Sequence, residues 1–319
     1  MKKPLLFALP LVFLATQAFG QAAFPPPPPK VSPAVGTIDM HVHSHPDVFG
    51  RSMDDIDVAT LAKARGMRGI VLKNHISETA SRAALVMHAV PGIEVFGGIV
   101  LNNAVGGINP VAVEWMHRFY GSRGKVVWLP TFESDKHVKT FGKPDAKGIE
   151  VAPGGKVTPQ MEEVLKIIAR ENLVLATGHV HAYEVVAVVK RAKELGVKNI
   201  IITHALTSVP GLTWEQAKEV TGMGAVIEIC FLQFLAGPNA PLPFLTHWTQ
   251  TNAKTVSQAI KELGAKNLVI SSDLGQSANM THADGIEVAI AQMRKEGVSD
   301  GDIDLMMRKT PARLLGLAN

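Results

Sequence analysis

The segment Gly36–His43 reads GTIDMHVH, an apolar run that begins at a glycine and ends in two histidines. Residues two apart in a strand share a face, so His41 and His43 are expected to point to the same side. The rise of about 3.3 Å per residue separates them by roughly 6–7 Å, a spacing at which two imidazoles can bind one cation. A His-x-His pair also occurs between ordinary surface histidines, so the pair needs support from the rest of the chain.

That support comes from seven further strand-like runs, which amphipathic stretches with helical spacing separate. The expected strands are Gly36–His43, Gly69–Lys73, Glu94–Leu101, Lys125–Thr131, Leu173–Gly178, Asn199–Thr203, Ala225–Cys230 and Asn267–Ser272. The expected helices are Asp57–Arg65, Thr79–His88, Pro110–Tyr120, Pro159–Arg170, Glu184–Leu195, Trp214–Val220, Ala253–Leu263, Gly285–Lys295 and Asp302–Leu315. This alternation predicts the α/β class, and within it a single-domain (β/α)8 TIM barrel whose strands all end on one face. An open doubly wound sheet is the alternative, but no glycine-rich phosphate loop follows the first strand.

The N-terminal residues have the pattern of an export signal. A basic start at Lys2 and Lys3 precedes an apolar run, and small residues lead up to Gly20. We therefore expect residues 1–20 to be a signal peptide, 21–35 a Pro-rich linker and 36–319 the barrel domain. A membrane anchor is the alternative, but the run is shorter than the ~20 residues a span needs, and Pro10 interrupts it. The expected location is periplasmic or secreted, without stable membrane association after cleavage.

Composition narrows the class of protein further. The formal net charge is only +4, and no dense basic patch with interleaved aromatic residues occurs, which argues against nucleic-acid binding. Cys230 is the single cysteine, so no internal disulfide can form and the fold must depend on its core. Because Cys230 ends an apolar strand, we expect it to be buried packing.

The histidines are distributed unevenly along the predicted elements. Of the 12 in the chain, only His88 and His117 fall inside expected helices, and the other ten fall at strand ends or in the loops that follow. His179, His204 and Asp273 end the fifth, sixth and eighth strands. Neutral imidazoles and a carboxylate that meet at one end of a barrel suit zinc, or a similar divalent ion with an open position for water.

This order of residues resembles the amidohydrolase superfamily, over a region from about Thr37 to Leu317. The segments Ile38–Asp47, Gly69–His75, Ala176–His179 and Ser271–Gln276 are most similar to an uncharacterised amidohydrolase-like group. The resemblance implies four histidine metal ligands: His41, His43, His179 and His204. It implies that Asp273 is both a metal ligand and a proton shuttle.

One departure from the superfamily pattern concerns the fourth strand. Many members carry there a carbamylated lysine that bridges two metals, whereas Val126–Thr131 contains no lysine. Glu133 could supply a bridging carboxylate, or it could be a solvated loop residue. Lys73, at the end of the second strand, is a candidate for carbamylation or for binding an anionic substrate, because a lysine ending an apolar strand needs a partner. Both one ion and two ions stay open.

Two long loops after the fourth and seventh strands, Phe132–Thr158 and Phe231–Thr249, are expected to shape a substrate pocket. Several residues near the strand ends could contact a substrate or could simply be exposed. They are His75, counted as catalytic here, and His181, Arg51, Arg82, His247 and Trp248.

The function expected from these observations is that of an exported metal-dependent hydrolase. It would direct an activated water at an amide, ester, lactone or similar bond of a small molecule, with Asp273 moving the proton. A metal-dependent decarboxylase or isomerase is an alternative, since one fold supports many reactions. A non-catalytic metal- or ligand-binding protein is another, although such a protein needs no proton shuttle.

Overall fold

The computed structural model describes residues 31–318, and from Ser32 onward they form one compact unit. The expected signal peptide (1–20) and the linker up to residue 30 lie outside the described residues. The packed part begins slightly earlier than expected. Ser32 donates to Glu287 at 2.6 Å, and Arg308 donates to the carbonyl oxygens of Pro33 and Val35 at 2.9 Å each. Residues 32–35, which we assigned to the linker, therefore pack on the barrel.

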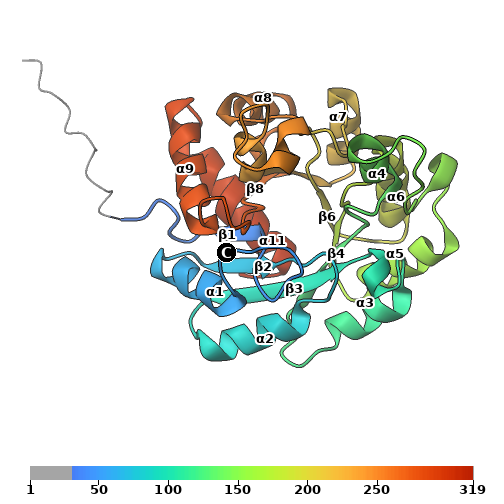
Figure 1. Ribbon diagram of the computed structural model, residues 1–319, viewed down its shortest axis with the longest axis horizontal. Helices are drawn as coiled ribbons and strands as arrows, with labels where there is room; N and C mark the ends of the chain where they lie inside the picture. Colours follow the sequence, from blue (N-terminus) through green and yellow to red (C-terminus); the bar gives the residue numbers. More distant parts are fainter. Residues whose placement is uncertain (1–30, 319) are drawn as a thin grey trace, which may run out of the picture. The chain divides into compact units, whose positions relative to one another are not determined.

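Eight parallel strands form one sheet in sequential order, which confirms the predicted barrel (Figure 1). They are β1 (Ile38–Val42), β2 (Gly69–Leu72), β3 (Glu94–Val100), β4 (Gly124–Trp128), β5 (Val174–Ala176), β6 (Asn199–Ile202), β7 (Val226–Cys230) and β8 (Leu268–Ser271). The sheet closes beyond the end of β8. There the Asp273 amide donates to the His41 carbonyl at 2.8 Å, and the His43 amide donates to the Leu274 carbonyl at 2.9 Å.

Helices follow the strands and surround them, as Figure 1 shows. They are α1 (Asp55–Ala64), α2 (Ala80–Ala89), α3 (Pro110–His117), α4 (Asp135–Phe141), α5 (Pro159–Arg170), α6 (Ala182–Glu194), α7 (Trp214–Gly222), α8 (Ala253–Leu263), α9 (His282–Lys295), α10 (Asp300–Asp304) and α11 (Thr310–Leu315). Short 3-10 turns lie at η1 (Asn103–Val105), η2 (Pro153–Gly155), η3 (Phe231–Leu235), η4 (Pro243–His247) and η5 (Ala265–Asn267). Within residues 31–318, no helix combines the length and apolar character needed to cross a bilayer.

The structure departs from the expected elements in two places. Helix α4 lies inside the loop Phe132–Thr158, where we predicted no helix, and the Ser134 hydroxyl accepts from the His137 amide to cap its start. The expected last helix Asp302–Leu315 is broken into α10, a π-helical turn η6 (Leu305–Lys309) and α11. Helix α4 is short and polar, so it lacks the apolar periodicity from which a helix is predicted.

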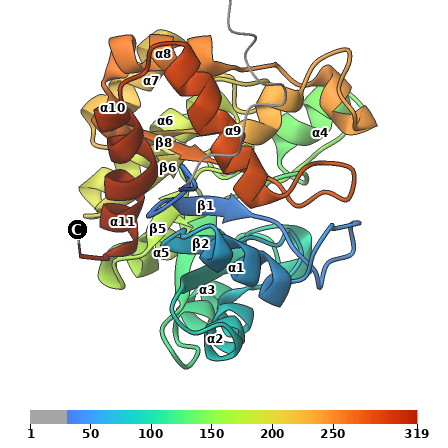
Figure 2. The same ribbon diagram turned by 90° about the vertical axis from the view of Figure 1, so that its left-hand side faces the viewer.

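Two apolar clusters make up the core. The larger one fills the space between strands and helices, and the smaller one fills the inside of the barrel. Side chains of α11, among them Leu314 and Leu315, belong to the inner cluster and close the amino-terminal end of the barrel. Figure 2 shows α11 and α4 at opposite ends of the strands. Helix α11 thus covers the end of the barrel opposite the one at which the strand-end histidines lie (Figure 2).

An irregularity in β1 positions the first two predicted ligands. The pairing of β1 with β2 shifts between Asp39 and Val42. Ile38 and Met40 therefore face the inner cluster, whereas Val42 belongs to the outer one. A β-bulge changes which side chains face inward by adding one unpaired residue. As a result, His41 and His43 point inward directly after the inward-facing Met40.

Candidate metal centre and its pocket

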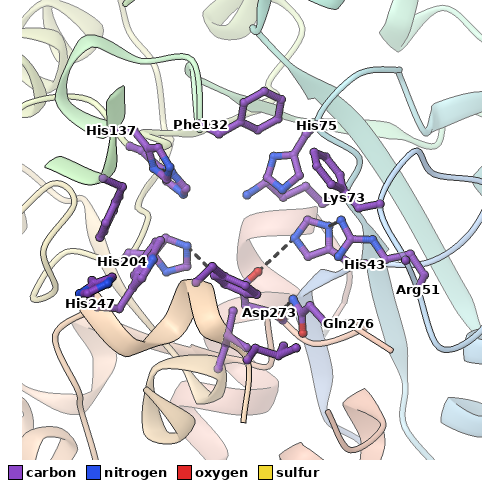
Figure 3. A pocket seen from close by; sticks show the side chains of 18 of the residues that line it. His43, Arg51, Lys73, His75, Phe132, His137, His204, His247, Asp273 and Gln276 are labelled. Atoms are coloured by element: carbon purple, nitrogen blue, oxygen red, sulfur yellow. Dashed lines mark hydrogen bonds and ion pairs between the residues drawn. The ribbon is translucent and has the colours of Figure 1, made fainter. Parts of the chain in front are cut away.

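A pocket of about 750 Å³ opens at the carboxyl-terminal end of the barrel. Its walls come from segments that follow different strands, and Figure 3 shows the polar ones facing a common space. The polar lining residues are His43, Arg51, Lys73, His75, His137, Thr140, His179, His204, His247, Asp273, Gln276 and Ser277. The barrel thus brings together side chains separated by more than two hundred positions in the sequence.

The Asp273 carboxylate is the centre of this group. Its Oδ1 lies 3.0 Å from His41 Nε2 and 3.1 Å from His43 Nε2, and its Oδ2 lies 3.4 Å from His204 Nε2. Burial opposes ionisation of Asp273, but the charge on His41 and the hydrogen bonds from His41 and His43 hold its pKa well below its usual range. Asp273 is therefore a carboxylate that three imidazoles face.

Unusual backbone geometry turns two of these side chains into the barrel. His204 and Asp273 each lie two residues past a strand end and have positive φ angles of 52° and 55°. Residues other than glycine rarely adopt this region, at a cost of about 1–3 kcal/mol, and such residues cluster at functional sites. The prediction that these residues end their strands was close, but a backbone turn, and not strand alternation, aims their side chains.

A second layer of polar groups lies beneath His41. Its Nδ1 is 3.4 Å from Glu228 Oε2 and 3.8 Å from Cys230 Sγ, and its Nε2 is 2.9 Å from Lys73 Nζ. A carboxylate at Nδ1 favours the tautomer that carries its proton there, which leaves Nε2 free to bind a cation. Burial disfavours the protonated form of His41, but the negative charge of Asp273 raises the pKa of His41 above its usual value. Positive charge is therefore favoured between these two residues.

The donor atoms suit a divalent cation. Among the described residues, His41, His204, Cys230 and Asp273 each offer one ligand atom, and these atoms all lie within 4.8 Å of one another. Burial lowers the pKa of His204 to about 4, and burial together with the Arg51 charge lowers that of His43. Neutral imidazoles beside an ionised carboxylate are the donor set that zinc and similar ions prefer.

Lys73 contacts the same nitrogen of His41 that would bind such an ion, so the ion and Lys73 would lie close together. It is almost completely buried, and its Nζ lies over the Trp128 ring at 5.6 Å as well as against His41. Among the described residues no carboxylate forms an ion pair with it, and burial lowers its pKa. A lysine with a lowered pKa can lose its proton, or move, when a cation binds at His41 Nε2.

His179 lies on the wall of the pocket beside a residue that the sequence did not single out. Its Nδ1 is 2.9 Å from Nδ1 of His137 in α4, and the two rings stack at 5.0 Å. Burial lowers the pKa of His137 to about 4 and that of His179 well below its usual value. Gly178 lets the segment after β5 approach the end of β4, because a Cβ there would lie 2.3 Å from the Leu129 carbonyl oxygen.

The structure does not bring Glu133 into the centre. Its Oε2 accepts from the Asn103 amide at 2.6 Å, and the residue does not line the pocket. The bridging role considered for Glu133 therefore finds no support, because the turn after β4 directs its side chain toward η1. His75 does line the pocket, where its ring stacks on His43 at 4.9 Å and its Nδ1 lies 2.9 Å from the Thr131 hydroxyl.

The remaining candidates divide between the pocket and its surroundings. Arg51 lines the pocket, and its charge is paired with Asp47 at 2.8 Å. Trp248 and His247 also line it, as expected of a capping loop. Two candidates do not line the pocket, because other carboxylates hold them: Arg82 pairs with Asp55 at 2.7 Å, and His181 pairs with Asp135 at 2.8 Å.

Sequence reasoning missed three residues of the site: Glu228, Cys230 as a potential ligand, and His137. A signal for Glu228 exists, because it is a charged residue inside the apolar strand Val226–Cys230. His137 and His282 were both counted among the strand-end and loop histidines, which was wrong. They lie in α4 and α9, and His282 does not line the pocket.

Comparison with solved structures supports the fold. An organophosphorus hydrolase from Deinococcus radiodurans superposes with a TM-score of 0.59 at 18% identity, covering 88% of this chain and 93% of that one. A mutant of a PTE-like lactonase from the same organism gives a TM-score of 0.59 at 17% identity, covering 90% and 98%. At this identity the similarity shows the barrel fold alone, and at the level of fold it agrees with the predicted superfamily resemblance.

Comparison with sequences places the chain in a family. No curated protein matches it. The sequence model of a family of unknown function, DUF6282, matches residues 36–228, which is more than half of the chain and includes β1 to β6. This agrees with the resemblance to an uncharacterised group. The chain therefore belongs to DUF6282.

Proposed function

We propose that this protein is a metal-dependent hydrolase that acts on an ester, lactone or amide bond of a small molecule. The observation that carries the proposal is the convergence of His41, His43 and His204 on the Asp273 carboxylate at the floor of the pocket. Solved structures with the same fold include proteins described as an organophosphorus hydrolase and a PTE-like lactonase, which agrees with this activity.

The chain's own residues would hold the ion and move the proton. A divalent ion such as zinc would supply the Lewis acidity that activates water and polarises a carbonyl group. Glu228 fixes the His41 ring, so that Nε2 faces Asp273 Oδ1. Asp273, kept ionised by its neighbours, accepts the proton of the attacking water and returns it to the leaving group.

The pocket walls indicate the kind of substrate. Phe49 and Phe132 pack edge to face at 5.8 Å on one side, and Phe141 stacks on Trp248 at 5.0 Å on another. The Arg51 charge at the pocket is compensated by Asp47, so it leaves little net attraction for an anion. Such a pocket suits a substrate with an apolar or aromatic body, whose carbonyl group would reach the floor near Lys73.

Purified protein provides the test. Elemental analysis after purification without added metal should find one or two divalent ions per chain. The protein should then hydrolyse members of a panel of aryl esters, lactones and amides. Chelation should abolish the activity, and zinc should restore it. Protein that neither contains nor takes up metal would contradict the proposal, and turnover confined to carboxylated aromatics without hydrolysis would favour a decarboxylase instead.

Export is a separate part of the proposal and depends on the sequence pattern before Gln21. N-terminal sequencing of the protein from its native host should begin at Gln21. An intact Met1 in a membrane fraction would identify residues 1–20 as an anchor.

A further inference from the structure

We propose that His137 is a metal ligand and that it completes a three-imidazole group with His179 and His204, on the side of the pocket opposite His43 and His75 (Figure 3). The inference rests on the metal centre of the proposed function and adds a ligand from α4. The sequence left open whether the site holds one ion or two, and these ligands would define the position of a second ion.

The arrangement of the rings supports this assignment. They form a continuous series, with centroids 5.4 Å apart for His41 and His204, 5.2 Å for His204 and His179, and 5.0 Å for His179 and His137. In Figure 3, His137 and His204 lie on one side of the pocket and His43 and His75 on the other, with Asp273 between them. The pocket therefore has imidazoles on two opposite sides.

The Asp273 carboxylate links these two sides. Its Oδ1 faces His41 and His43, whereas its Oδ2 faces His204. One carboxylate with its two oxygens directed at different sets of imidazoles can contact two cations, one on each side. Asp273, two residues after β8, would then take the bridging role that was considered for Glu133.

The attachment of α4 next to His179 also supports the assignment of His137 as a ligand. The Ser134 hydroxyl donates to the His179 carbonyl at 2.7 Å, and Asp135 binds His181 at 2.8 Å. Together with the contact of 2.9 Å between the His137 and His179 Nδ1 atoms, three interactions tie the start of α4 to the segment after β5. A ligand held in place in this way loses little conformational entropy when an ion binds.

The hydrogen bonding of the buried ring nitrogens indicates which atoms could bind the ion. Among the described residues, His179 Nε2 and His204 Nδ1 are buried and have no hydrogen-bond partner. In each ring the other nitrogen, His179 Nδ1 or His204 Nε2, faces His137 or Asp273, and it can present its lone pair to an ion when the buried nitrogen carries the ring proton. The donor set of three imidazoles and one carboxylate oxygen suits zinc or cobalt.

A simpler role for His137 would be to orient His179 through a hydrogen bond, and two substitutions separate the roles. His137→Ala removes both the ligand and the hydrogen bond. His137→Gln keeps a hydrogen-bonding group of similar reach but replaces imidazole with an amide, a poor zinc or cobalt ligand. His247→Ala is the matched control, because His247 is an exposed histidine that lines the same pocket.

The experiment is a titration of the metal-free full-length proteins with Co²⁺, followed by binding stoichiometry and by the visible absorption of the ion. We expect both His137 variants to lose about 10–100-fold or more in affinity for one ion, since even indirect partners of ligands have effects of that size. Their cobalt spectra should change, while the His247→Ala spectrum should match the wild type. Thermal melts establish that each variant is folded.

Two results would overturn the inference. One is wild-type affinity and spectrum in folded His137→Ala, and the other is a loss in His137→Ala that His137→Gln fully restores, which would make His137 a positioning residue. The result is independent of turnover. If Co²⁺ binding depends on His137 but no substrate is hydrolysed, the hydrolase proposal fails and the ligand assignment stands.

Discussion

The inside of the barrel consists of two layers, one apolar and one polar, and the same strands contribute side chains to both. Toward the amino-terminal end, strand β1 contributes Ile38 and Met40 to an apolar layer that α11 closes. One position beyond Met40, His41 enters a layer of imidazoles and carboxylates, and His43, just past the end of the strand, joins it. Strand β7 repeats the change, with Val226 in the apolar layer and Glu228 in the polar one.

The apolar layer stabilises the fold, whereas the polar layer contains the groups that could perform chemistry. Apolar side chains need only fill their layer, because the hydrophobic effect has no direction. Buried polar groups must each find a partner, since an unpaired one is costly in this low-dielectric interior. The polar layer of this barrel is therefore less tolerant of small displacements, and it is the layer from which function follows.

The largest effect should come from Asp273→Asn in the polar layer. If Asp273 moves the proton, kcat should fall by ~10²–10⁴-fold on a substrate found in the panel, because general acid–base catalysis contributes about that much. The melting temperature should change little, since the side chains are nearly isosteric. Steady-state kinetics and a thermal melt measure both, with the exposed Asp300→Asn as control. Turnover at the wild-type rate would remove Asp273 from the mechanism.

The opposite outcome is expected from Ile38→Ala in the apolar layer. Ile38 is 1% exposed, and its truncation should lower the free energy of unfolding by about 2–5 kcal/mol through lost burial and a cavity. The turnover of the protein that stays folded should be unchanged. Denaturant unfolding compares it with Ile56→Ala, whose side chain is 49% exposed and whose loss should cost within about 0.5 kcal/mol. Equal costs for the two variants would contradict the division into layers.

A smaller effect is expected from Glu228→Gln, which keeps the shape beneath His41 and removes the charge. Outer partners of metal ligands typically contribute about 10–100-fold to metal affinity, so zinc affinity measured by chelator competition should fall by that factor. Glu194→Gln on the exposed face of α6 is the control. Unchanged zinc affinity would show that Glu228 does not orient His41.

The smallest effect concerns His282, a buried histidine outside the pocket. Burial lowers its pKa from 6.5 to about 4, so between these values the unfolded chain binds a proton that the folded protein does not. Its contribution to stability is complete above pH 6.5 and is lost as the pH falls toward 4. As the pH falls through this range, the free energy of unfolding of the wild type should decrease more steeply than that of His282→Gln, by up to about 1.4 kcal/mol per pH unit. Denaturant midpoints measured at several pH values test this, and parallel curves would contradict it.

Much of the fold was predictable because its signals are local. Each strand is a short apolar run, each of the longer helices has an apolar face, and both patterns are visible without tertiary information. Helix α4 was missed because it is short and polar. The long final helix was predicted as continuous, since nothing in its apolar pattern marks the π-helical turn at Leu305–Lys309.

The site was predictable to the extent that it depends on strand ends. His41, His43, His204 and Asp273 converge because parallel barrel strands end on one face. Their exact aim was not predictable, since it depends on a bulge in β1 and on positive φ angles at His204 and Asp273. Glu133 shows the limit, because its place near a strand end says nothing of where the following turn directs it.

The sequence by itself determined the barrel, the face on which a site would form and the identity of the residues that surround Asp273. Only the tertiary structure decided that Glu228 lies beneath His41, that Lys73 lies against the same ring, and that α4 brings His137 to His179. The physical reason is one of range. Periodicity records which way a residue faces within its own element, whereas contacts between loops depend on chain paths that hydrogen bonds such as Ser134 to His179 fix only in the folded protein.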